Sequence, residues 1–190
     1  MKPCLLICWL FFVATSIYAQ SPVLPLNNDT KKITYTEVVP VDGTRQTELY
    51  SRARLWFINT FKSANSAVQP EEKEPGVLIG RGWQDINIVS LRQPVSIMLW
   101  YTARITCKDG RYKYDLSDFA IQYHPTPEYL VPPVTPAENF LGDGLGKKGK
   151  PDTLSPQIRQ QLNEAASQLA ADLKAAMQKP AAGTANGKDW

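Results

Sequence analysis

Two long runs of alternating polar and apolar residues, joined by Asp109-Gly110, constrain the fold of this chain more than any other feature. The runs extend from Pro94 to Cys107 and from Arg111 to Tyr123. An Asp-Gly pair is favoured in two-residue type I′ turns, so the two runs are expected to form an antiparallel hairpin. Counting outward from the turn makes one face apolar, with the pairs Cys107–Tyr112, Ile105–Tyr114 and Ala103–Leu116.

The other face of this hairpin is polar. The same register places Thr106 opposite Lys113, Arg104 opposite Asp115 and Thr102 opposite Ser117. Beyond Leu116 the apolar positions change phase to Phe119, Ile121 and Tyr123. A one-residue shift would otherwise move these side chains away from the core, so we predict a β-bulge near Ser117-Asp118.

The residues before the hairpin predict a strand, a helix and a second strand. Residues 32–41 are rich in β-branched and aromatic side chains and end in a turn at Asp42-Gly43, which is typical of a strand. Between Thr44 and Ala64 apolar residues recur every three or four positions, which predicts an amphipathic helix. The expected core side of this helix carries Leu49, Ala53, Trp56, Phe57 and Phe61, and its opposite side carries Arg45, Glu48, Arg52 and Lys62.

Two glycines mark the strand that begins at Val77. Gly80 and Gly82 are two residues apart, so they leave one face of the strand without side chains. We expect the helix backbone or a bulge to approach this face, and a ligand or partner is the functional alternative. The acidic run over 69–76 that precedes the strand is interpreted as a solvated hairpin tip rather than a metal site.

The composition changes after Tyr123. Residues 124–155 contain six prolines and several glycines, which indicates a linker or a surface-wrapping arm. Its Gly144 to Gly149 stretch matches GxGxxG, but no strand precedes it, so we expect no dinucleotide site. Ser155-Pro156 and Lys179-Pro180 then delimit a predicted helix over 156–179, with Ser155 as its cap. Whether this helix docks on its own domain or on a partner stays open, and residues 180–190 are expected to be a disordered tail.

The N-terminus predicts export. A basic start, an apolar run from Leu5 to Val13 and a small-residue site ending at Ala19 resemble a secretory signal peptide, cleaved after Ala19. The apolar run is shorter than the roughly 20 residues that span a bilayer, so we expect no membrane span in the mature chain. Residues 20–31 are interpreted as a leader outside the domain.

Few residues offer chemistry. The only histidine is His124, and of three cysteines only Cys107 would remain after cleavage, on the predicted core face. We therefore expect no catalytic residues, metal or cofactor. Asp115 and Asp118 are the carboxylates that a hydrolase could use, although Arg104 opposite Asp115 explains that residue by structural pairing. The formal net charge of +3 is too small to favour nucleic acid as a partner.

Several short sequence motifs, taken in order, resemble those of one family. They are Tyr35-Thr36-Glu37-Val38-Val39, Asp42-Gly43, Glu48 to Ala53 with Trp56-Phe57, Ile79 to Gly82, and Lys108 to Tyr114 with Asp118-Phe119. The stretch from Lys32 to Tyr123 is similar to the secreted bacterial family catalogued as domain of unknown function 4468, which has a TATA-binding-protein-like (TBP-like) fold. The resemblance implies a Gram-negative source and an exported protein, and no catalytic residue or cofactor comes with it. Pro70, Pro75 and the arm after Tyr123 depart from the family pattern.

Together these features predict an α+β domain over 32–123, in which a curved antiparallel sheet carries a helix on one face and a C-terminal helix follows. The expected function is a non-enzymatic binding module of the periplasm or cell surface. Met98, Trp100 and Arg104 are the candidate contact residues for another envelope protein, because aromatic and arginine side chains are enriched where interfaces bind tightly. The alternative for Trp100 is that the C-terminal helix covers it. Alternative functions are a carboxylate-dependent hydrolase and a structural protein that self-associates through the C-terminal helix.

Overall fold

The computed structural model describes residues 22–61, 68–70, 76–142 and 152–179. The predicted export signal, the acidic residues 71–75, the glycine motif at 144–149 and the tail from 180 lie outside these ranges. The elements follow in the order β1 (Tyr35–Pro40), α1 (Gln46–Thr60), β2 (Val68–Pro70), β3 (Val77–Ser90), β4 (Gln93–Lys108), β5 (Arg111–Tyr123), β6 (Thr135–Pro136), the 3-10 helix η1 (Ala137–Phe140) and α2 (Leu154–Gln178).

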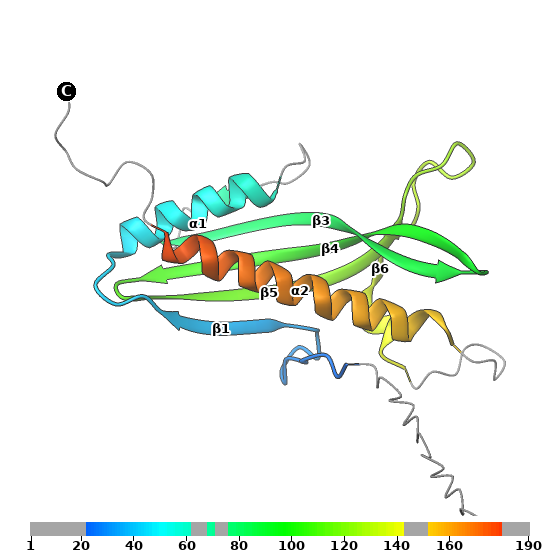
Figure 1. Ribbon diagram of the computed structural model, residues 1–190, viewed down its shortest axis with the longest axis horizontal. Coiled ribbons are helices and arrows are strands. Elements are labelled where there is room, and N and C mark those ends of the chain that lie inside the picture. The colour runs from blue at the N-terminus through cyan, green and yellow to red at the C-terminus, as the bar shows by residue number, and fades with distance from the viewer. Residues whose placement is uncertain (1–21, 62–67, 71–75, 143–151, 180–190) are drawn as a thin grey trace, which may run out of the picture.

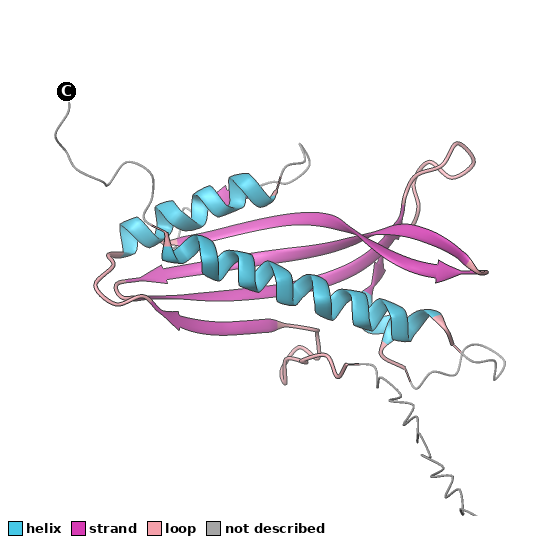
Figure 2. Cartoon of the chain, viewed as in Figure 1, coloured by secondary structure: helices cyan, strands magenta, loops and turns pink. Residues whose placement is uncertain are grey.

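The strands form one antiparallel sheet, and both long helices lie on one side of it. The strand order is β1-β5-β4-β3-β2, and β6 pairs with β5 near Ala120. Figures 1 and 2 show α1 and α2 side by side over the same face, so the molecule has two layers. The predicted α+β class, with an antiparallel sheet and a C-terminal helix, is confirmed.

The register of the β4–β5 hairpin is the predicted one. Cys107 pairs with Tyr112, Ile105 with Tyr114 and Ala103 with Leu116. The predicted bulge is also present: the register shifts between Trp100 and Thr102, and Asp118 opposite this shift has a φ of 52°. Phe119 and Ile121 return to the core, but Tyr123 is 48% exposed. Its predicted core position is wrong because it is the last residue of β5, where the chain leaves the sheet.

The turn of this hairpin is not the predicted type I′. That turn needs a positive φ at both central residues, and here Gly110 has one, 72°, whereas Asp109 does not. The start of α1 shapes the turn instead. The Asp109 carboxylate accepts a 2.7 Å hydrogen bond from the Gln46 N–H, and the Gly110 N–H donates to the Thr44 carbonyl. Two consecutive positive φ values occur in the β3–β4 turn, at Leu91 and Arg92.

Helix α1 packs its aromatic residues onto the two glycines of β3. A Cβ atom on Gly80 would lie 2.6 Å from Cε1 of Phe57, and one on Gly82 would lie 2.3 Å from Cδ1 of Phe61. Distances under 3 Å are not tolerated between real carbon atoms without a shift. The helix therefore fills the gap that the glycines leave, with aromatic rings rather than with its backbone.

Arg52 is buried, although the sequence pattern places it on the solvent side of α1. Its Nη1 donates a 2.6 Å hydrogen bond to the Met177 carbonyl in the last turn of α2, and its Nη2 pairs with Glu48. A cation is favourable at the negative end of a helix. The prediction failed because α2 covers this side of α1, and nothing in the α1 sequence reports that contact.

Helix α2 docks on its own domain. Its buried apolar residues, Ile158, Leu162, Leu169, Leu173 and Met177, belong to the same core as the sheet and α1. Asp152, rather than the predicted Ser155, caps the helix: its carboxylate accepts from the backbone N–H groups of Leu154 and Ser155 at 3.0 and 3.1 Å. Ser155 lies inside the first turn, so its hydroxyl pairs with Asp152 instead.

The segments flanking the predicted domain also enter the core. Leu24, in the expected leader, is 5% exposed, and Ile33 is fully buried. In the arm, Ala137 is buried, and Glu138 accepts a 3.0 Å hydrogen bond from the Ile33 N–H. Leu24 therefore brings the leader into the core of the domain. In the arm, η1 contacts β5 and α2, whereas Leu130 and Val131 are exposed.

Candidate binding surface

The face of the sheet opposite the helices is the candidate functional surface; we call it the open face. Side chains alternate along each strand, and the core side of β4 carries Leu99, Tyr101, Ala103 and Ile105. The intervening residues point to the open face. They are Met98, Trp100, Thr102, Arg104, Thr106 and Lys108 on β4, with Arg81, Trp83 and Asp85 opposite them on β3 and Arg111, Lys113 and Asp115 on β5.

A group of aromatic and cationic side chains, here the tryptophan cluster, lies at the middle of this face. It consists of Arg81, Trp83, Trp100 and His124. Trp83 pairs directly with Trp100, with ring centroids 6.3 Å apart, and the Arg81 guanidinium lies 5.4 Å from the centroid of Trp100. That separation fits a cation–π contact. Both indoles are partly exposed, so the cluster presents aromatic surface to a partner.

The arm holds one end of the tryptophan cluster in place. The Trp100 indole N–H donates to Oε1 of Gln122 at 2.8 Å, and Gln122 donates in turn to the Pro132 carbonyl at 2.8 Å. His124 approaches Trp83 edge-on and lies 2.7 Å from the Asp85 carboxylate. These bonds fix the indole rings before any partner arrives, which lowers the entropy cost of binding.

The three predicted contact residues differ in how exposed they are. Trp100 is on the open face and lies away from α2, so the alternative in which that helix covers it is wrong. Arg104 is on the same face and partly exposed. Met98 is only 7% exposed and lies opposite Gln122, where the arm passes. Met98 therefore contributes to packing rather than to an accessible surface. The sequence could not show this, because it does not indicate where the arm folds.

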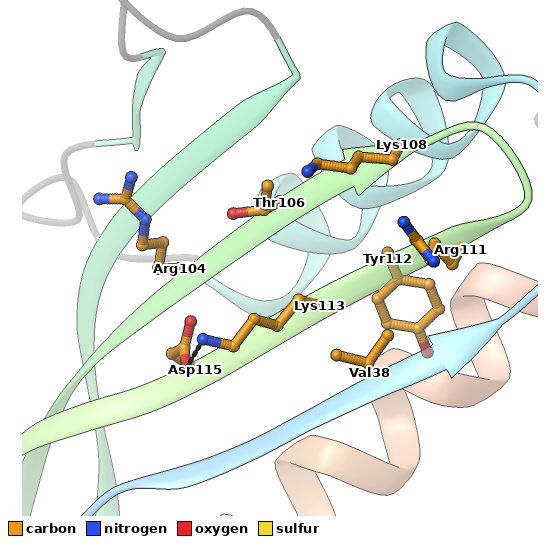
Figure 3. A pocket seen from close by; sticks show the side chains of 8 residues that line it. All are labelled: Val38, Arg104, Thr106, Lys108, Arg111, Tyr112, Lys113 and Asp115. Atoms are coloured by element: carbon orange, nitrogen blue, oxygen red, sulfur yellow. Dashed lines mark ion pairs between the residues drawn. The ribbon is translucent and has the colours of Figure 1, made fainter. Parts of the chain in front are cut away.

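Sequence reasoning missed a second feature of the open face, here the basic pocket. It is a cavity of about 370 Å³ whose lining includes Arg104, Lys108, Arg111, Lys113 and Asp115. Figure 3 shows these side chains projecting from the neighbouring strands β4 and β5 around Thr106. The signal was present in the predicted register, which sets Lys108 opposite Arg111. The net charge of the whole chain, +3, gives no indication of this local group of cations.

The residues considered for chemistry are held by structural contacts. Asp115 pairs with Lys113 at 3.0 Å, and Asp118 pairs with Lys32 at 2.6 Å while 46% exposed. Cys107 is buried, and desolvation raises the pKa of its thiol to about 12, so it stays protonated. Within the described ranges, no three His, Cys, Asp or Glu side chains group as metal ligands.

No helix in the part of the chain that the structure describes is long and apolar enough to cross a membrane.

The chain is similar to several solved structures and to a family model, and no curated protein matches it. A TBP-like protein from Parabacteroides distasonis is 22% identical, with a TM-score of 0.60, over 83% of this chain and 98% of that one. A DUF4468 family protein from Bacteroides ovatus is 20% identical, with a TM-score of 0.63, over 84% of this chain and 92% of that one. The shared fold thus extends beyond residues 35–122, which match the model of the domain of unknown function DUF4468 with TBP-like fold. Residues 35–122 therefore form a domain of the DUF4468 family, with its TBP-like fold.

Proposed function

We propose that this protein is an exported, non-enzymatic binding module of the periplasm or cell surface that contacts another envelope protein through the tryptophan cluster. The observation that carries the proposal is the pair Trp83–Trp100, partly exposed and held by Arg81 and Gln122 on the face that both helices leave open. Tryptophan and arginine dominate binding energy at protein interfaces. A pre-ordered pair of indoles is suited to that use.

The contacts of the reactive side chains support a binding role over a hydrolytic one. Within the described residues, His124 contacts the Asp85 carboxylate and the Trp83 ring, and neither is a hydroxyl or thiol that the imidazole could activate as a nucleophile. Asp115 and Asp118 each face a lysine. A carboxylate acid catalyst instead needs a desolvated site that favours its protonated form. None of the contacts in the described ranges favours the hydrolase, so we put forward one function.

Site-specific photo-crosslinking tests the binding surface. A benzoylphenylalanine at Thr102, beside Trp100 on the open face, is compared with one at Arg54, which is exposed on α1. Both variants are expressed with the N-terminal segment so that they reach the compartment that the export proposal requires. We expect one discrete crosslinked protein from position 102, none from position 54, and loss of the product in the Trp100→Ala background.

Two results would contradict the proposal. The first is the same set of products from positions 54 and 102. The second is a product from position 102 that survives in Trp100→Ala, provided that this variant retains the thermal transition of the wild type. Export is measured separately: N-terminal sequencing of the mature protein is expected to begin at Gln20, and an N-terminus at Met1 would refute cleavage after Ala19.

A further inference from the structure

The basic pocket at the β4–β5 end of the sheet is built at a cost to the fold. Lys108 lies directly opposite Arg111 in the antiparallel register, and like charges in that position destabilise a strand pair. Among the residues that the structure describes, no carboxylate lies within ion-pairing distance of either side chain. Two facing cations without a compensating carboxylate in the described part of the chain are therefore a feature that packing does not explain.

The other charged groups of the pocket do not neutralise this pair. Arg104 and Lys113 also line the cavity, and Asp115 is the carboxylate among its lining residues. Asp115 is already engaged by Lys113 at 3.0 Å. A single carboxylate ligand would balance one of the two facing cations, Lys108 and Arg111, whereas a group with two or more negative charges matches both.

The geometry also suits a small anionic group. The cavity of about 370 Å³ lies within the range of small-molecule sites. Arginine offers a planar fork of donors that suits phosphate oxygens, lysine adds a point charge, and the Thr106 hydroxyl on the cavity wall can donate a further hydrogen bond. All of these groups are attached to two paired strands, so their positions are set by the sheet rather than by a loop.

We infer that the basic pocket binds a phosphate group carrying at least two negative charges. The inference rests on the proposed function in one respect, since the pocket would recognise a charged group of a ligand on the same open face. Thr106 is six positions from Trp100 along β4, which is about 20 Å of strand. The two sites can therefore be tested independently.

Titration with inorganic pyrophosphate, followed by amide NMR shifts and calorimetry, tests the pocket. The site variant is Lys108→Gln with Arg111→Gln. The matched control is Arg54→Gln with Lys179→Gln, which removes the same number of charges from exposed positions on α1 and just after α2. We expect saturable shifts at residues 104–115 in the wild type, at least a tenfold loss of affinity in the site variant, and wild-type affinity in the control.

A thermal shift provides a second readout. Pyrophosphate is expected to raise the Tm of the wild type and of the control, but not that of the site variant, because only a folded pocket binds the ligand. In buffer without phosphate, the site variant is expected to melt at or above the wild-type temperature, since its cross-strand repulsion is gone. A site variant whose Tm lies well below that of the wild type would contradict the argument that the facing cations destabilise the fold.

The source of the phosphate is assigned by two further probes. Binding of a hexose phosphate, without binding to phosphatidic acid vesicles, indicates a soluble or glycan-borne phosphate, and the reverse indicates a lipid headgroup. Equal loss of affinity in the site and control variants, or no saturable shift at residues 104–115, would overturn the inference. So would tighter binding of a single-stranded oligonucleotide that also depends on Arg81. Failure here leaves the crosslinking result at position 102 unaffected, so the two proposals fail separately.

Discussion

Single residues in this chain decide which neighbours can approach. Gly80 and Gly82 have no side chains, and the rings of Phe57 and Phe61 occupy the space that side chains there would fill. Arg52 does the opposite, because a charged side chain enters the core and joins α1 to the last turn of α2. In both cases the residue is explained by a contact with another element rather than by its own strand or helix.

At Gly80, alanine is expected to destabilise the fold. Its Cβ would lie 2.6 Å from the Phe57 ring, which is buried and packed between Trp56 and Phe61. Overpacking of this kind costs about 1–3 kcal/mol, measurable as a lower urea midpoint. Gly142→Ala is the control, because no atom lies within 4 Å of a Cβ there. A Gly80→Ala protein as stable as the wild type would show that the ring moves aside freely.

Helix boundaries in this protein depend on residues outside the helices. The carboxylate of Asp109, in the β4–β5 turn, binds the first N–H of α1, and that of Asp152 binds the first two of α2. The N-cap positions themselves, Arg45 and Thr153, make no side-chain cap bond. Boundary signals in sequence therefore located α2 to within two residues but assigned its cap to Ser155 instead of Asp152.

Replacement of Asp152 is expected to weaken α2 in a pH-dependent way. Hydrogen bonds from Ser155, first from its side chain and then from its backbone, hold the pKa of Asp152 below its ordinary value. Asp152→Ala should therefore cost about 1 kcal/mol near neutral pH. A carboxyl group whose pKa is lowered by folding stabilises the folded state at pH values above its unfolded-state pKa. This stabilisation is lost as the pH falls through the folded-state pKa. The difference between the two proteins should thus shrink below about pH 4.

Urea unfolding of both proteins at neutral and acidic pH measures this effect. Asp152→Asn, which keeps an acceptor for the backbone N–H groups, is expected to retain most of the stability at neutral pH. A difference between the wild type and Asp152→Ala that stays constant down to acidic pH would show that the charge of Asp152 has no part in the cap.

At the scale of the whole molecule, the domain is larger than the family segment. Leu24 and Ile33 before it, and Ala137 and α2 after it, belong to the same core as the sheet. The view that the domain ends at Tyr123, with α2 free to mediate self-association, does not fit this packing. The apolar side of α2 is already occupied by the sheet and by α1.

Truncation after residue 142 is therefore expected to unfold the domain. It removes five large buried side chains of α2, each worth about 1.5–3 kcal/mol, which together approach the total stability of about 5–15 kcal/mol of an ordinary domain. Circular dichroism should show no cooperative thermal transition. Truncation after Lys179 is the control and should melt like the full chain. A cooperative transition in the shorter protein would show that α2 docks only loosely.

The sequence by itself determined the features that arise from local repetition. Alternation along β4 and β5, with a tight turn between them, sets the register, the bulge near Asp118 and the face on which Trp100 lies, because each depends on neighbours along the chain. The periodicity of α1 and α2 located both helices for the same reason. The same register also implied the pairing of Lys108 with Arg111, although overall charge gave no indication of a basic pocket.

Only the tertiary structure decided which surfaces remain exposed. Met98 and Trp100 are two residues apart on one strand face, yet Met98 is buried and Trp100 is partly exposed. The placement of α2 on the face opposite Trp100 likewise determines that the tryptophan cluster and the basic pocket share an uncovered sheet. Such outcomes depend on contacts between segments far apart in the chain, and a local pattern records that a residue is apolar or charged but not which distant segment packs over it.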